Sequence, residues 1–130
     1  ATSKNLNNLG VLYARYGKYE EAEAQFQKVV KKEEYVPALV NMANIAYLRG
    51  ESKIAASLYD RALKRDSKNR LALMGAIRVR SELGDAATVK RLLESLRNVD
   101  PVAAASLSDI GSSSGRASSS DPVVSGWSDD

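Results

Sequence analysis

The chain of 130 residues contains no cysteine and no histidine. Without cysteine it can form neither a disulfide framework nor a thiolate metal site. Without histidine it lacks the commonest general base and the commonest side-chain metal ligand. The composition therefore predicts no metal site and no cofactor, and it leaves the cellular compartment undetermined.

Long apolar runs and catalytic motifs are also missing. No apolar stretch approaches the roughly 20 residues of a membrane span, so we expect no direct membrane insertion. The sequence holds no phosphate-binding loop, no nucleophile elbow and no HExxH motif. The acidic pairs Glu20–Glu21 and Glu33–Glu34 are expected on solvated surfaces, because a two-carboxylate enzyme needs its acids to face each other in a pocket. We therefore expect a protein that is not an enzyme.

The most informative feature that is present is a repeat. Gly17, Gly50 and Gly84 lie 33 and 34 residues apart, each between two amphipathic segments. This period predicts stacked helical hairpins, none of which buries its apolar face alone. Glycine at these places fits the left-handed residue that ends a helix. Phe26 and Tyr59 are expected to fill the core between successive units.

The three frames carry comparable residues at equivalent places. In the first these are Leu6, Leu9, Gly10, Tyr13, Gly17, Ala22, Phe26 and Val29; in the second Leu39, Met42, Ala43, Ala46, Gly50, Ala55, Tyr59 and Ala62; in the third Leu73, Ala76, Ile77, Arg80, Gly84, Val89, Leu93 and Leu96, followed by Pro101. This pattern resembles the tetratricopeptide repeat, a helix–turn–helix unit of about 34 residues. The third frame departs from it at Ile77, Arg80 and Val89, which leaves open how its helices pack.

The first helix has an apolar pattern of its own. Leu6, Leu9 and Leu12 (or Tyr13) recur at helical spacing, which predicts that they form its buried face. Because this helix is expected to begin almost at the first residue, either a leader was cleaved or the chain is a piece of a longer protein. We expect the second, because the exposed first helix lacks a cap on its other side.

The resemblance implies an all-α fold, a right-handed superhelical solenoid of about three hairpins. The hairpins are expected at about residues 3–35, 36–69 and 70–101, which together form a repeat domain over residues 1–101. Asp100 and Pro101 fit an N-cap and a first-turn proline, so residues 101–110 predict a capping helix from a truncated fourth repeat. Residues 111–130 are rich in Ser and Gly and predict a flexible acidic tail.

Charge is unevenly distributed along the chain. Residues 1–100 carry 18 Lys and Arg against 12 Asp and Glu, whereas residues 101–130 carry one Arg against four Asp. A basic body and an acidic tail are expected to attract each other or to steer a partner. We expect no nucleic-acid partner, because no aromatic residues are interleaved with the basic clusters and no reading motif is present.

The resemblance also implies a protein or peptide partner, because the first helix of each tetratricopeptide hairpin lines a concave groove. The groove residues it implies are Asn7, Asn8, Val11, Val40, Asn41, Asn44, Tyr47, Leu71, Met74 and Arg78.

Asparagine carries the main expectation for this groove. Asn8 and Asn41 occupy equivalent places 33 residues apart. Because an asparagine amide both donates and accepts hydrogen bonds, this pair is expected to bind a peptide backbone without reading its sequence. Arg78 is expected to bind a carboxylate, and Val40, Leu71 and Met74 to seat apolar side chains.

Some tetratricopeptide domains hold the C-terminal carboxylate of chaperones with two Lys, two Asn and one Arg. The corresponding places here hold Asn7, Val11, Asn41, Leu71 and Gly75. Only Asn41 matches, so a partner is expected to bind through internal residues.

The tail contains the only tryptophan of the chain, Trp127, within DPVVSGWSDD. One interpretation is an incidental tryptophan in a flexible end; the other is a segment that docks on this groove, on a neighbouring copy or on another protein. Taken together, the sequence predicts a non-enzymatic adaptor. The alternative is a structural module that forms homo-oligomers through exposed repeat ends or the tail, and a more distant one is an accessory domain of an enzyme.

Overall fold

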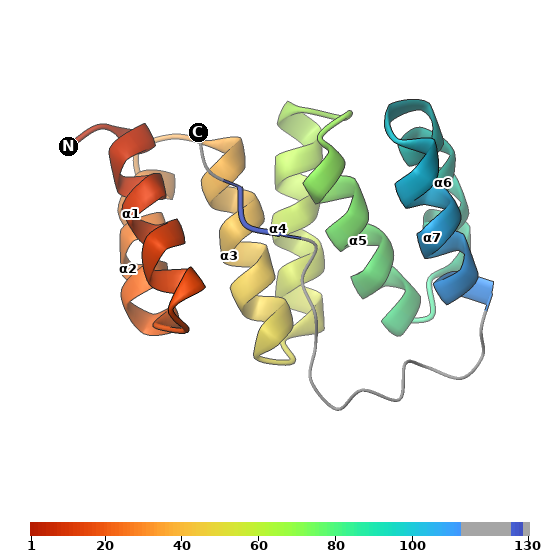
Figure 1. Ribbon diagram of the computed structural model, residues 1–130, viewed down its shortest axis with the longest axis horizontal. Coiled ribbons are helices and arrows are strands. Elements are labelled where there is room, and N and C mark those ends of the chain that lie inside the picture. Colours follow the sequence, from red (N-terminus) through yellow and green to blue (C-terminus); the bar gives the residue numbers. More distant parts are fainter. Residues whose placement is uncertain (113–125, 129–130) are drawn as a thin grey trace.

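The computed structural model describes residues 1–112 and 126–128, which contain seven helices and no strand (Figure 1). The helices are α1 (Ser3–Arg15), α2 (Tyr19–Val30), α3 (Val36–Leu48), α4 (Ser52–Arg65), α5 (Arg70–Glu82), α6 (Ala86–Val99) and α7 (Pro101–Ser112). Helices α1 and α2, α3 and α4, and α5 and α6 pack as pairs, and each pair packs against the next. The predicted all-α stack of helical hairpins is confirmed.

Glycine ends the first helix of each pair. Gly17, Gly50 and Gly84 have φ values of 75°, 78° and 78°, a region that side-chain-bearing residues rarely adopt. Each glycine N–H also donates to a carbonyl in the last turn of the helix before it. The left-handed conformation predicted from their spacing is confirmed.

Phe26 and Tyr59 are the largest side chains of the core, with 0% and 1% of their surface exposed. Each ring lies against a glycine on a neighbouring helix. A Cβ atom at Gly10 would lie 2.4 Å from Phe26 Cε1, and one at Gly75 would lie 2.3 Å from Tyr59 Cζ. The absence of a side chain at these two glycines therefore lets the helices approach closely around the rings.

The expected apolar face of the first helix is partly wrong. Leu9 and Leu12 are 38% and 51% exposed, whereas α1 buries Asn7, Gly10, Val11 and Ala14. The physical reason is that α1 packs against α2 and α3. Among the residues that the structure describes, no helix covers the side of α1 that carries the two leucines.

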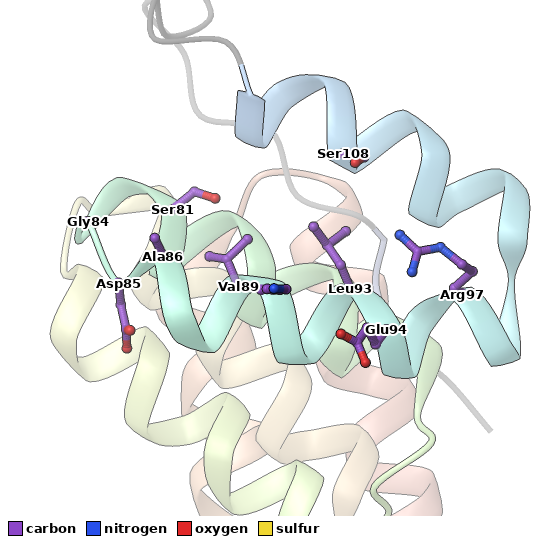
Figure 2. Close-up of a pocket in the computed structure, with 10 residues that line it drawn as sticks. Ser81, Gly84, Asp85, Ala86, Val89, Leu93, Glu94, Arg97 and Ser108 are labelled. Atoms are coloured by element: carbon purple, nitrogen blue, oxygen red, sulfur yellow. The ribbon is translucent and has the colours of Figure 1, made fainter.

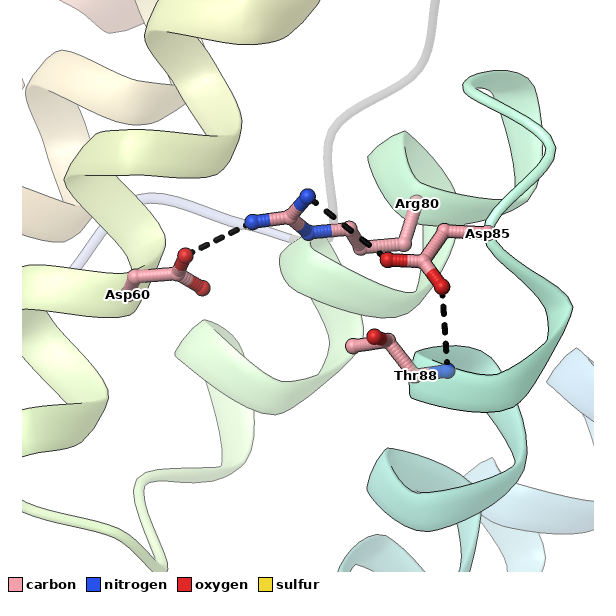
Figure 3. A network of polar contacts seen from close by, with 4 residues as sticks. All are labelled: Asp60, Arg80, Asp85 and Thr88. Atoms are coloured by element: carbon pink, nitrogen blue, oxygen red, sulfur yellow. Dashed lines mark hydrogen bonds and ion pairs between the residues drawn. The ribbon is translucent and has the colours of Figure 1, made fainter.

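The third hairpin packs like the others despite its departures from the pattern. Ile77 and Val89 are buried, and Arg80 takes part in a polar network (Figure 3). An Arg80 N–H donates to Asp60 Oδ2 of α4 at 2.7 Å, and Arg80 also lies 3.7 Å from Asp85 Oδ2. Arg80 therefore connects α4 and α5 to the start of α6.

Asp85 also serves as the N-cap of α6. Its Oδ1 accepts a hydrogen bond from the Thr88 N–H at 3.2 Å. Hydrogen bonds from Thr88, with the nearby charge of Arg80, hold the pKa of the Asp85 carboxyl below its usual value. The Asp85 side chain thus caps the start of α6 and also forms an ion pair with Arg80 of α5.

Helix α7 covers the last hairpin by packing against α5 and α6. Ala103, Ala104 and Leu107 form its buried face. Asp100 caps it, because Oδ1 accepts from the Ala103 N–H at 3.0 Å while Oδ2 accepts from Arg70 Nε at 2.7 Å. The helix ends at Ser112, two residues beyond the expected capping helix.

Only part of the expected tail can be placed. Of residues 111–130, residues 113–125 and 129–130 lie outside the described part of the chain. Residues 111–112 belong to α7. Residues 126–128 lie beside α3, whose Asn41 donates a hydrogen bond to the Ser128 carbonyl (Figure 1). Among the described helices, none has the length and apolar character that crossing a membrane requires.

Candidate functional site

Three asparagines on α1 and α3 lie together and are almost completely buried. Asn7 and Asn41 have 0% of their surface exposed, and Asn44 has 2%. Asn41 and Asn44 are three residues apart on α3, so they share one face of that helix. Asn41 Nδ2 donates to Asn7 Oδ1 of α1 at 3.0 Å. We call Asn7, Asn41 and Asn44 the asparagine site.

The asparagine site binds the main chain of the segment Gly126–Ser128. Asn41 Oδ1 accepts from the Ser128 N–H at 2.7 Å, and Asn41 Nδ2 donates to the Ser128 carbonyl at 2.7 Å. Asn7 Nδ2 donates to the same carbonyl at 2.9 Å. Asn44 Nδ2 donates to the Gly126 carbonyl at 2.8 Å. These contacts involve backbone groups only, so the asparagines hold the segment without reading its side chains.

A core tyrosine orients one of these amides. The Tyr59 hydroxyl of α4 donates to Asn44 Oδ1, and both groups are buried. Because its oxygen is engaged in this way, Asn44 presents its Nδ2 to the Gly126 carbonyl. Burial raises the pKa of the Tyr59 hydroxyl well above its usual value, so this group stays protonated and donates at neutral pH.

The side chain of Trp127 lies against the first hairpin. Its ring is 6.1 Å from that of Tyr19 between centroids, with the planes tilted by 36°. Trp127 and Tyr19 are both half-buried and pack against the core cluster that contains Phe26. On the other side of the segment, a Cβ atom at Gly126 would lie 3.7 Å from Leu71 Cδ2 of α5.

The remaining residues expected in the groove occupy varied environments. Val11 and Val40 are buried in the two core clusters, whereas Leu71 and Met74 are half-buried at the edge of the larger one. The Tyr47 hydroxyl donates to a Glu82 carboxylate oxygen at 2.6 Å.

The asparagine pair differs in part from the expected one. Asn7 joins Asn41 at Ser128, whereas the sequence register pairs Asn41 with Asn8. Asn8 and Arg78 are half-buried, and their expected roles stay predictions. Tyr59 and Tyr19 were missed as neighbours of the site, because the repeat pattern assigns Tyr59 to the core and gives no signal for Tyr19.

A separate cleft of about 470 Å³ lies between α6 and α7 (Figure 2). Helix α6 lines one side of the cleft with apolar and charged side chains, namely Val89, Leu93, Lys90, Glu94 and Arg97. Ser108 of α7 lies on the opposite side. None of the residues expected in the groove lines this cleft. Within residues 1–112 and 126–128, no cluster of acidic side chains is arranged to hold a metal ion.

Comparisons with known proteins agree with the fold. Residues 3–35 match the family model described as tetratricopeptide repeat. A solved structure described as the first TPR of Spaghetti (RPAP3) bound to the HSP90 peptide SRMEEVD superposes with a TM-score of 0.74 at 22% sequence identity. The match covers 82% of this chain and 90% of that chain. Among curated protein sequences, no significant match is found.

Proposed function

We propose that this chain, which matches the tetratricopeptide repeat model over residues 3–35 and shares the fold of a solved TPR domain, is a non-enzymatic adaptor that binds an extended segment of a protein partner in the concave groove of its repeat array. The observation that carries the proposal is the pairing of the Asn41 side-chain amide with both backbone groups of one residue in the segment Gly126–Ser128. Asn41 accepts from the N–H of Ser128 and donates to the carbonyl of the same residue.

The chemistry of the asparagine site suits this role. An amide that pairs with both backbone groups of one residue fixes the direction and register of a bound segment. Asn7 and Asn44 add two further donors. Asn7 and Asn41 both donate to the Ser128 carbonyl, and Asn44 donates to the Gly126 carbonyl. With Gly126–Ser128 in place the three amides are buried, and its main-chain groups supply hydrogen-bond partners to all three.

The similar solved structure supports a peptide as the class of ligand, because that domain is described as bound to an HSP90 peptide. The residues of this chain favour another kind of peptide. Of the five places that hold a chaperone carboxylate in the family, only Asn41 matches. We therefore propose recognition of internal residues of the partner.

A peptide library tests this function without assuming a partner. A full-length Trp127→Ala variant, in which the segment Gly126–Ser128 loses its largest contact, is used to select from random displayed heptapeptides. We expect enriched peptides to lose about tenfold or more in affinity when Asn7→Ala and Asn41→Ala are added, since each hydrogen bond contributes about 0.5–1.5 kcal/mol.

Asn98→Ala, which removes an exposed asparagine of α6, is the matched control and is expected to leave affinity unchanged. Failure to enrich any peptide, or peptides that bind equally well without Asn7 and Asn41, would contradict the proposal.

Self-assembly is a second candidate, favoured by apolar surface at both ends of the array. Leu9 and Leu12 are exposed on α1, and Val102 is 80% exposed on α7. Contacts between unlike ends would be head-to-tail and would extend with concentration. Sedimentation equilibrium over a hundredfold range of concentration tests this: a mass that rises with concentration supports it, and a constant monomer mass excludes it.

A further inference from the structure

The segment on the asparagine site presents one side chain to the body of the protein. The backbone groups of Gly126 and Ser128 are the ones that meet the asparagines. Between them, Trp127 places its indole ring near Tyr19, against the core cluster of the first hairpin. The asparagine amides therefore hold the backbone on both sides of Trp127, and Tyr19 contacts its ring.

Gly126 has a backbone conformation that restricts which residue can precede the tryptophan. Its φ is 140°, a value that residues with a side chain rarely adopt. The space beside it is not the obstacle, because an added Cβ would make ordinary contact with Leu71 at 3.7 Å. The preference for glycine at this place thus arises from the backbone angle.

We infer that the asparagine site and Tyr19 together recognise a segment that carries a Gly-Trp pair, and that Gly126–Ser128 of this same chain is the resident ligand, which a partner segment of like chemistry must displace. The inference rests on the proposed function. It adds a preference for a tryptophan side chain, and it identifies Gly126–Ser128 as the segment that competes with a partner. The acidic composition of residues 101–130 and the basic composition of residues 1–100 favour the same association.

Covalent attachment makes even a weak contact effective. A tethered ligand has an effective concentration that reaches the millimolar range. A partner peptide must compete with this concentration, so the affinity of the intact protein for a free segment is lower than that of a protein whose tail no longer docks.

A labelled peptide with the sequence DPVVSGWSDD tests the inference by fluorescence anisotropy. It is titrated with the wild-type chain, with full-length Trp127→Ala, and with full-length Trp127→Ala that also carries Asn41→Ala. We expect the Trp127→Ala chain to bind about tenfold more tightly than wild type, because its own tail no longer competes. The added Asn41→Ala is expected to remove most of this binding.

Two altered peptides test the specificity. Alanine in place of the tryptophan is expected to weaken binding to the Trp127→Ala chain about tenfold or more. Alanine in place of the glycine is expected to weaken it less, since only the backbone angle is affected. A peptide with alanine in place of the first valine, equivalent to Val123→Ala, is the matched control and is expected to bind unchanged.

The outcomes separate the inference from the function on which it rests. Equal affinity of the wild-type and Trp127→Ala chains would exclude the tail as resident ligand. Equal binding of the tryptophan and alanine peptides would exclude the aromatic specificity. If the DPVVSGWSDD peptide fails while library peptides bind through Asn7 and Asn41, the inference is wrong and the proposed function stands; if neither binds, both are wrong.

Discussion

The hydroxyl of Tyr59 donates a hydrogen bond to the side-chain oxygen of Asn44, and this contact joins the core of the second hairpin to the asparagine site. Tyr59 is 1% exposed and Asn44 is 2% exposed. A residue that fills the core thereby also decides which end of the Asn44 amide faces the bound segment. Packing and recognition are coupled through this one side chain.

We expect Tyr59→Phe to keep the fold but to weaken the binding of the segment Gly126–Ser128 to the asparagine site. The change leaves Asn44 Oδ1 without its donor, which costs about 1–3 kcal/mol in a buried setting. The amide is then free to rotate, and the hydrogen bond to the Gly126 carbonyl weakens. Chemical denaturation measures the first effect, and a red shift of Trp127 emission measures the second.

Tyr16→Phe is the matched control, because Tyr16 is 75% exposed. It is expected to change neither quantity. Identical stability and emission in Tyr59→Phe and wild type would show that the Tyr59 hydroxyl does not orient the site.

Phe26 is expected to contribute strongly to the stability of the hydrophobic core. Because its ring is fully buried between helices, Phe26→Ala is expected to cost about 3–5 kcal/mol. In a small repeat array this loss removes a large part of the total stability, so the whole array is expected to unfold at lower temperature. Leu12→Ala, at a half-exposed place on α1, is the control. A melting temperature only a degree or two below wild type would contradict the role of Phe26.

Gly75 tests the close approach of α5 to α4. A Cβ at this place would overlap the Tyr59 ring at 2.3 Å, so Gly75→Ala is expected to destabilise the fold by about 1–3 kcal/mol through overpacking. Displacement of Tyr59 is also expected to disturb its hydrogen bond to Asn44. Combining Gly75→Ala with Tyr59→Phe in a double-mutant cycle measures the coupling, and strict additivity would contradict it.

Acid is expected to destabilise the protein through its capping carboxylates. A hydrogen bond from the Ala103 N–H, with the Arg70 side chain, holds the pKa of Asp100 below its usual value. A carboxyl with a lowered folded-state pKa stabilises the fold above its unfolded pKa of about 4, and this contribution is lost as pH falls through the folded value. We therefore expect wild type to melt above Asp100→Asn at pH 7, and the difference to disappear towards pH 2. A difference that is the same at every pH would contradict this.

Periodic residues made the helical hairpins predictable, because each unit repeats the same packing problem and solves it with similar side chains. Gly17, Gly50 and Gly84 placed the turns for the same reason. Leu9 and Leu12 show the limit, since helical spacing does not say which side of a helix has a neighbour. The choice of Asn7 beside Asn41 depends on how α1 lies against α3, which the register alone does not specify.

The contact between the asparagine site and Gly126–Ser128 was even less accessible to sequence reasoning. Asn7 and Ser128 are 121 residues apart in the chain, and no periodicity links them. The tryptophan marked the segment as unusual, but composition favoured an incidental tryptophan in a flexible end and did not choose between docking on this groove, on a neighbouring copy or on another protein. The orientation of Asn44 by Tyr59 likewise follows from side-chain geometry that the repeat pattern does not contain.

Asn41 binds the main chain of a segment through both Nδ2 and Oδ1 of its side-chain amide, and hydrogen exchange of the Ser128 backbone amide in the full chain tests this most directly. The Ser128 N–H donates to Asn41 Oδ1 at 2.7 Å, so ¹⁵N NMR is expected to find exchange slowed about tenfold or more relative to the free peptide DPVVSGWSDD. Asn41→Ala is expected to abolish this protection, whereas Asn98→Ala is expected to preserve it. Exchange of the wild-type Ser128 amide at the rate of the free peptide would contradict the account.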